Sequence, residues 1–218
     1  MHSKQIARQS GFTLVEISIV LVIVGLLLGG VLKGQELIDS AKTKNLAQDF
    51  RSVPMFINTY QDIFHALPGD DSRARSHVCP ASDTACTVNG NANGSIGGNW
   101  NDETGAGSEA IYFWQHIRLA NLAAGATSIA DPDFLPLNSV GGRLGIQTGG
   151  ATAPLGISGN YIICSAGIPG KIVRQLDGML DDGNPATGAM RAGVVTDSAL
   201  AEAATLDDGT AYVACLGV

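Results

Sequence analysis

The sequence has few charged and few aromatic residues, and it lacks an excess of positive charge. Charged residues make up 15% and aromatic residues 6% of the 218 residues, and the formal net charge is −7. This negative charge argues against nucleic-acid binding through bulk electrostatics. The low charge and the 28 glycines argue against a coiled coil or a charged disordered tail. They favour a loop-rich body that contains β-structure.

Motifs of common enzyme and metal-binding classes are also missing. The sequence has no nucleophile elbow, no phosphate-binding loop and no metal-binding cluster of histidines. None of its cysteines forms a C-x-x-C pair, and no histidine lies at zinc-finger spacing from them. We therefore expect a protein that is not an enzyme. His116 is interpreted as structural or exposed rather than catalytic, because no Ser or Cys nucleophile motif accompanies it.

The four cysteines are even in number and belong to a chain with an export-like N-terminus, which favours disulfides. Four cysteines allow three pairings. We favour Cys79–Cys86, which closes a short loop, and Cys164–Cys215, which ties the C-terminus to the body. Four buried free thiols are the alternative interpretation.

One long apolar stretch stands out, at residues 12–32. Glu16 is its only charged residue, and a helix of this length extends about 31 Å, enough to cross a bilayer. Lys4 and Arg8 precede it, and by the positive-inside rule they leave the C-terminal body outside the cytoplasm. An ordinary secretory signal would have a shorter apolar core followed by a small-residue cleavage site. Here a short basic leader comes first, and the apolar stretch continues into a helical pattern, so the segment differs from such a signal.

The string GFTLVE at residues 11–16, with a short basic leader before it and an apolar helix after it, resembles the type IV prepilin signature. The resemblance implies that residues 1–11 are a leader peptide. It also implies that a membrane peptidase cuts between Gly11 and Phe12 and methylates the new amino group of Phe12. Glu16 then becomes the fifth residue of the mature chain. A simple membrane anchor with a coincidental glutamate is the alternative.

The carboxylate of Glu16 has a physical role in this scheme. A lone carboxylate in hydrocarbon is costly unless it is protonated or paired. Cleavage would create an ammonium at Phe12, which can neutralise the Glu16 of a neighbouring subunit. The family resemblance implies the same pairing during filament assembly, and we expect it to select the register in which subunits join.

Two more features of the N-terminal helix bear on assembly: a pair of glycines and one departure from the family pattern. Gly25 and Gly29 form a G-x-x-x-G motif, which lets helices approach closely. Many major pilins carry a proline at the position occupied here by Lys33. The sequence therefore departs from a typical major pilin.

Residues 33–67 are predicted to continue the helix as its amphipathic half. Apolar residues at alternating spacings of three and four form one stripe, which is typical of a core-facing surface. Pro54 interrupts the stripe and predicts a bend or a local break, and Leu67 to Asp70 are expected to end the helix. The stripe consists of Phe50, Val53, Ile57, Tyr60 and Phe64.

Residues 68–218 are predicted to form an extracytoplasmic globular domain. Residues 68–108 are rich in turn-forming residues and predict a long loop, whereas 108–123 predict a second helix with Ser108 as its N-cap. The expected fold class is α+β and pilin-like, with the long helix packed on a small antiparallel sheet with long loops. The predicted strands lie in the apolar runs at 143–149, 160–167 and 210–218.

Two polar stretches resemble cation-binding loops. Residues 89–96 mimic the first half of an EF-hand loop, but an asparagine replaces the leading aspartate and Trp100 takes the place of the bidentate glutamate. Turn-forming Asn-Gly repeats are therefore favoured there. In 171–184 a short helix followed by an acidic turn predicts either solvated carboxylates or a calcium site, and some type II secretion pseudopilins have an acidic calcium loop. The candidate ligands are Asp177, Asp181, Asp182 and Asn184.

These observations predict a structural subunit of a type IV pilus or related filament, polymerised through its N-terminal helix. A type II secretion pseudopilin and a minor pilin or adhesin at the filament tip are alternatives, and an exported membrane-tethered enzyme is an alternative from another class. The resemblance implies pilin subunits in a homo- or hetero-polymer, a prepilin peptidase and the inner-membrane assembly machinery as partners, and nucleic acid only if the filament serves DNA uptake.

The expected location follows from the same reading. The chain would sit in the bacterial inner membrane in a single pass, with its C-terminal domain in the periplasm, and would then enter a pilus or a periplasmic filament. No cofactor is expected apart from the candidate calcium ion.

Overall fold

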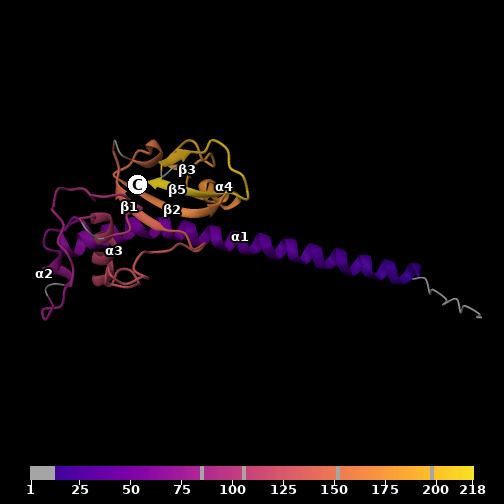
Figure 1. Ribbon diagram of the computed structural model, residues 1–218, viewed down its shortest axis with the longest axis horizontal. Coiled ribbons are helices and arrows are strands. Elements are labelled where there is room, and N and C mark those ends of the chain that lie inside the picture. Colours follow the sequence, from indigo (N-terminus) through magenta and orange to yellow (C-terminus); the bar gives the residue numbers. More distant parts are fainter. Residues whose placement is uncertain (1–12, 84–85, 105–106, 151–152, 197–198) are drawn as a thin grey trace, which may run out of the picture. The chain divides into compact units, whose positions relative to one another are not determined.

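The computed structural model describes residues 13–83, 86–104, 107–150, 153–196 and 199–218. A long N-terminal helix precedes a five-stranded antiparallel sheet (Figure 1), which confirms the predicted α+β pilin-like fold. The chain divides into two compact units, one ending at Ala41 and the other beginning at Lys42. The elements are α1 (Leu14–Phe64), α2 (Ala74–Val78), α3 (Glu109–Leu119), β1 (Leu144–Thr148), η1 (Pro154–Gly156), β2 (Tyr161–Pro169), α4 (Gly170–Leu180), β3 (Met190–Thr196), β4 (Ala199–Glu202) and β5 (Ala211–Gly217).

Helix α1 continues through Pro54, so the local break expected there is wrong. A proline inside a helix removes one backbone hydrogen bond. Here Val53 and Ile57, on either side of it, are both buried in the core, and this packing holds the turn in helical form. The helix ends at Phe64, before Leu67, because His65 adopts a left-handed conformation with φ of 53°.

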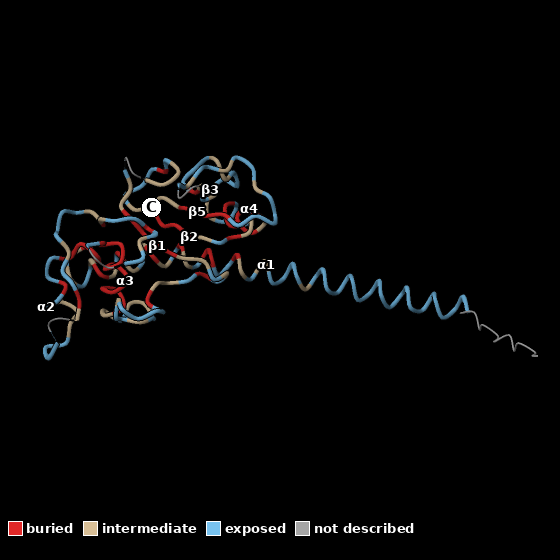
Figure 2. The backbone as a smooth tube through the Cα atoms, viewed as in Figure 1, coloured by how far each residue is buried: buried red, intermediate tan, exposed pale blue. Residues whose placement is uncertain are grey.

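The predicted apolar stripe of α1 lies in the core of the second unit. Phe50 and Tyr60 are fully buried, Val53 and Ile57 are nearly so, and Phe64 packs partly buried against the same cluster. Figure 2 shows the buried segments of α1, α3 and the sheet gathered in this region. The stripe is therefore a packing surface, as its spacing indicates. Its partners across the core include Ile111, Phe113, Ile146, Ile163, Ile168, Leu176 and Ala214.

The sheet has the strand order β1-β2-β5-β3-β4, with every neighbouring pair antiparallel. Strands β1, β2 and β5 are the three predicted from the sequence, whereas β3 and β4 were not predicted. Helix α4, which connects β2 to β3, contacts β2, β3 and β5. Side chains alternate between the two faces. One face meets the helices, and the other carries a smaller apolar cluster made by Trp100, Ile157, Ile162, Cys164, Val213 and Cys215.

Helix α3 is shorter than the helix predicted at 108–123, and it lies deep in the second unit. Ser108 occupies the N-cap position, but its hydroxyl makes no capping hydrogen bond. Every residue from Glu109 to Arg118 is buried, so packing rather than capping holds the helix. The loop at 68–108 also contains the short α2, which the sequence did not predict.

Replacing Phe50 with alanine should destabilise the second unit, because the change leaves a cavity in a fully buried site. We expect a loss of about 3–5 kcal/mol in the free energy of unfolding, measured by denaturant titration of the full chain in detergent micelles. Met55→Ala is the matched control on the same helix, since Met55 is 56% exposed and should change stability by less than about 0.5 kcal/mol. Equal losses in the two variants would contradict the assignment of the core face.

Candidate functional site

The first unit presents a continuous apolar surface. In the part of the chain that the structure describes, α1 is the one helix long and apolar enough to cross a membrane. None of its most apolar segment is buried, as Figure 2 also shows, and Leu14 and Leu26 are 86% and 74% exposed. Burying one such side chain is worth about 1.5–3 kcal/mol. Lipid or other apolar helices are therefore the surroundings that this surface fits.

Glu16 lies at the N-terminal end of that surface, where its carboxylate forms a capping box with Thr13. The carboxylate accepts hydrogen bonds from the Thr13 backbone N–H at 2.8 Å and from its hydroxyl at 2.7 Å, and the Glu16 N–H donates to Thr13 Oγ1 at 3.3 Å. The negative charge also meets the positive end of the helix dipole. These contacts within one chain hold the carboxylate in place at the helix end. The predicted cleavage position, Gly11 and Phe12, lies outside the described residues.

The glycines of this segment are not required by packing within the chain. Apart from the adjoining backbone of α1 itself, a Cβ atom built on Gly25, Gly29 or Gly30 would meet no atom within 4 Å. Glycine costs up to about 1 kcal/mol relative to alanine in a helix. The small-residue surface at Gly25 and Gly29 is thus available for close approach by another helix.

The first buried carboxylate in the loop at 68–108 is Asp70. Its oxygens accept hydrogen bonds from the N–H groups of Asn93 at 3.0 Å and Gly94 at 2.8 Å. The amide oxygen of Asn93 accepts in turn from the Ser95 N–H at 2.9 Å, a local turn that asparagine side chains favour. The stretch compared with an EF-hand loop therefore presents backbone N–H groups to a carboxylate.

Glu109, at the start of α3, also accepts backbone hydrogen bonds from this stretch. Its carboxylate accepts from the N–H groups of Asn91 at 3.1 Å and Gly97 at 2.8 Å, and only 4% of the residue is exposed. A calcium loop directs oxygen atoms at its centre, whereas these contacts are those of a loop wrapped around two of the protein's own anions. The turn interpretation of residues 89–96 fits this geometry.

A third buried carboxylate, Asp71, joins α1 to α2. It accepts hydrogen bonds from the Tyr60 hydroxyl at 2.8 Å and the Arg73 N–H at 2.8 Å, and lies 2.7 Å from Nδ1 of His77. Burial would raise its pKa, but the hydrogen bonds from His77, Arg73 and Tyr60 hold the pKa of Asp71 below its ordinary value. The ring of Phe64 stacks on His77 with centroids 5.2 Å apart. Sequence reasoning missed this network.

His116 is fully buried and bonded on both ring nitrogens. Nδ1 accepts from the Gly69 N–H at 3.0 Å, so Nε2 carries the proton and donates to the carbonyl of Val88 at 2.9 Å. Burial lowers the pKa of His116, which keeps the ring neutral. With both nitrogens engaged by backbone, His116 fixes the start and the middle of the loop at 68–108 to α3, in agreement with its predicted structural role.

Both favoured disulfides are present in the structure. Cys79 and Cys86 are seven positions apart in the sequence and close a short loop. Cys164 and Cys215 join β2 to β5. The second pair are direct cross-strand neighbours in the sheet. The first bridge therefore closes part of the long loop, and the second ties the C-terminal strand to the body of the sheet, as the sequence predicted.

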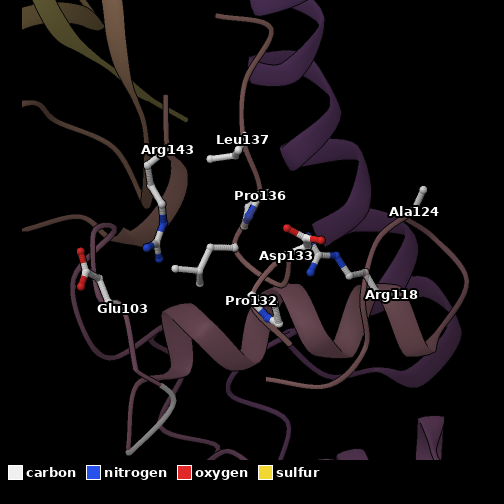
Figure 3. Close-up of a pocket in the computed structure, with 9 residues that line it drawn as sticks. Glu103, Arg118, Ala124, Pro132, Asp133, Pro136, Leu137 and Arg143 are labelled. Atoms are coloured by element: carbon white, nitrogen blue, oxygen red, sulfur yellow. The ribbon is translucent and has the colours of Figure 1, made fainter. Parts of the chain in front are cut away.

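A cavity of about 590 Å³ lies beside α3 and the loop that follows it. Figure 3 shows Arg143 and Glu103 on one side of it and Arg118 and Asp133 on the other. Arg118 donates to the carbonyls of Ala126 and Phe134 and so fixes this loop to α3. With two cations balanced by two carboxylates, the lining shows no preference for an ion of either sign. The lining residues are Glu103, Arg118, Ala124, Pro132, Asp133, Leu135, Pro136, Leu137 and Arg143.

The acidic turn after α4 brings together three of the four candidate cation ligands. Single carboxylate oxygens of Asp177, Asp181 and Asp182 all lie within 4.8 Å of one another. Asn184 belongs to the same turn, where its N–H donates to Asp182 at 2.8 Å and its side-chain oxygen accepts from the Ala186 N–H at 3.2 Å. Asn184 thus shapes the turn, and the three aspartates form the cluster.

Comparison with known proteins gives one family-level result. Residues 6–32 match the family model described as the prokaryotic N-terminal methylation motif. This motif is the signature of type IV pilins and pseudopilins, a structural rather than enzymatic family, and it confirms the resemblance seen in the sequence. No curated protein and no solved structure matches the chain.

Replacing Asp71 with asparagine should lower stability, because donors that now share one carboxylate would face an amide. We expect a loss of about 1–3 kcal/mol in the free energy of unfolding at pH 7. Since the pKa of Asp71 is lowered from 3.8 by folding, its contribution is present above pH 3.8 and is lost as the pH falls below that value. The difference between wild type and Asp71→Asn, measured by denaturant titration in micelles, should therefore shrink below pH 3.8.

The matched control is Asp62→Asn, which changes an exposed carboxylate of α1. It should leave the free energy of unfolding unchanged, both at pH 7 and below pH 3.8. A difference between wild type and Asp71→Asn that stays constant into the acid range would show that the charge of Asp71 contributes nothing.

Proposed function

We propose that this chain, which carries the type IV pilin and pseudopilin motif at residues 6–32, is a structural subunit of a type IV pilus or related filament. One observation carries the proposal: directly after the motif's cleavage position, α1 presents an uncovered apolar surface with a single carboxylate, Glu16, at its N-terminal end. An apolar helix suits a lipid bilayer before assembly and a bundle of like helices after it. The carboxylate suits pairing in such a bundle.

Processing would create the partner for this carboxylate. A prepilin peptidase would cut between Gly11 and Phe12 and methylate the amino group of Phe12, the residue that precedes Thr13 in the sequence. In a single subunit the Thr13 N–H and hydroxyl hold Glu16. In the filament the ammonium of a neighbouring Phe12 would add the opposite charge. This pairing can form only at one relative position of two subunits, so Glu16 sets the register.

The precursor would be anchored in the inner membrane by the first half of α1. Lys4 and Arg8 precede the apolar segment and favour a cytoplasmic N-terminus. The globular unit would then lie in the periplasm, a compartment in which disulfides form and persist. The disulfides Cys79–Cys86 and Cys164–Cys215 support this placement.

Pseudopilin and tip-located minor pilin are the alternative roles within the same family. Lys33, at a position where many major pilins carry a proline, favours a role other than a typical major pilin. Electron microscopy with an antibody against the globular unit separates these roles. Label along surface filaments indicates a major subunit, label at filament tips a minor pilin or adhesin, and label confined to the periplasm a pseudopilin.

Glu16→Ala should leave the chain inserted in the membrane but abolish its incorporation into filaments. The reason is that the apolar surface is unchanged while the charge that pairs with the neighbouring amine is gone. The measurement is the fraction of the chain in sheared filaments against the membrane fraction, by immunoblot. We expect the filament fraction to fall at least tenfold.

The control is Glu36→Ala, which removes another carboxylate from α1. Glu36 forms an exposed ion pair with Lys33 at 2.7 Å, within one helical turn, and exposed pairs contribute little. This variant should assemble as wild type does. Normal assembly of Glu16→Ala would refute the pairing role.

A further inference from the structure

The three aspartates at the end of α4 form a compact group of oxygen ligands. Asp177 lies in the last turns of the helix, and Asp181 and Asp182 directly follow it. One carboxylate oxygen from each lies within 4.8 Å of the other two. Calcium–oxygen distances are about 2.3–2.6 Å, so two oxygens bound to one calcium ion lie at most about 5 Å apart. The spacing of the three oxygens fits one shared calcium ion.

Asp177 distinguishes this group from an ordinary surface cluster of acids. The residue is fully buried, and neither of its carboxylate oxygens has a hydrogen-bond partner among the described residues. Burial, followed by the charges of Asp182 and Asp181, raises the pKa of Asp177 to about 6. Burying a carboxylate is unfavourable unless it is paired or binds a metal.

The other two carboxylates are held in place by the turn that follows. Asp181 accepts a hydrogen bond from the N–H of Met190 at 2.8 Å, and Asp182 accepts from the Thr187 hydroxyl at 2.8 Å. Gly188 adopts φ of 78°, and a Cβ atom there would collide with the carboxylate of Asp181. The turn therefore needs glycine at this position to approach Asp181. Both carboxylates keep lone pairs for a cation.

We propose that Asp177, Asp181 and Asp182 bind one calcium ion. Three carboxylates with no nitrogen or sulfur ligand select a hard cation. Magnesium demands a nearly ideal octahedron at about 2.0–2.1 Å and dehydrates reluctantly, whereas calcium accepts irregular oxygen sites in turns. The ion neutralises the buried charge of Asp177 and ties the end of α4 to the start of β3, where Met190 bonds Asp181.

The test is calcium-dependent thermal unfolding of the full chain in detergent micelles, after treatment with EDTA. Adding 1 mM CaCl₂ should raise Tm by several degrees, and isothermal titration should give one calcium ion per chain. Asp177→Asn should lose the calcium-dependent rise. Without calcium, its Tm should equal or exceed that of wild type, because an unpaired buried amide is less unfavourable than an unpaired buried carboxylate.

Two further variants keep the test decisive. Asp182→Asn changes an exposed ligand, so it should fold normally and still lose the calcium-dependent rise. Glu202→Gln removes an exposed carboxylate in β4 and should keep it. The proposal is overturned if calcium leaves the Tm of wild type unchanged, if Asp177→Asn and Asp182→Asn keep the rise, or if 1 mM MgCl₂ produces an equal rise.

Discussion

The structure depends on an apolar helical surface that its own unit does not cover. From Leu14 to Leu32 the large side chains of α1 are exposed, and this surface has too much apolar area to face water. A bilayer or a set of similar helices is the kind of environment that such a surface fits. Glu16 is compatible with both because it sits at the helix end, where Thr13 and the helix dipole satisfy its charge within a single chain.

The second unit shows how an acidic chain without enzymatic motifs uses its carboxylates. Asp70, Asp71 and Glu109 are each at least 96% buried, and they accept hydrogen bonds from the loop at 68–108. A loop of this length with little regular structure loses much conformational entropy when it is ordered. These buried acceptors, together with His116, fix the loop against α1 and α3, and one disulfide links two of the loop's own residues. These three buried carboxylates therefore serve as anchors for backbone.

The sequence predicted the elements that have a strong local pattern. The stripe on α1 follows the helical period, and β1, β2 and β5 are short apolar runs between glycines. Strands β3 and β4 lack that signal, because they contain small residues and β4 is largely exposed. The expected break at Pro54 failed because tertiary packing of its neighbours outweighs one lost hydrogen bond.

The candidate sites divide in the same way. Glu16 was predicted from its place in the GFTLVE string. The cluster of Asp177, Asp181 and Asp182 was predicted because its members are close in sequence, at the end of a short helix and in the turn after it. The network of Tyr60, Asp71 and His77 was not, since it joins residues whose proximity depends on where α1 ends and how the loop turns back. The cavity between Arg118 and Arg143 was not predicted either, because its lining residues come from separate segments and follow no sequence pattern.

The central claim is that processing creates the amine that Glu16 pairs with in a filament. The most direct measurement is the mass of the N-terminal peptide of the chain purified from cells that contain a prepilin peptidase. We expect a peptide that begins at an N-methylated Phe12. An intact N-terminus at Met1, in cells that process their other prepilins, would contradict it.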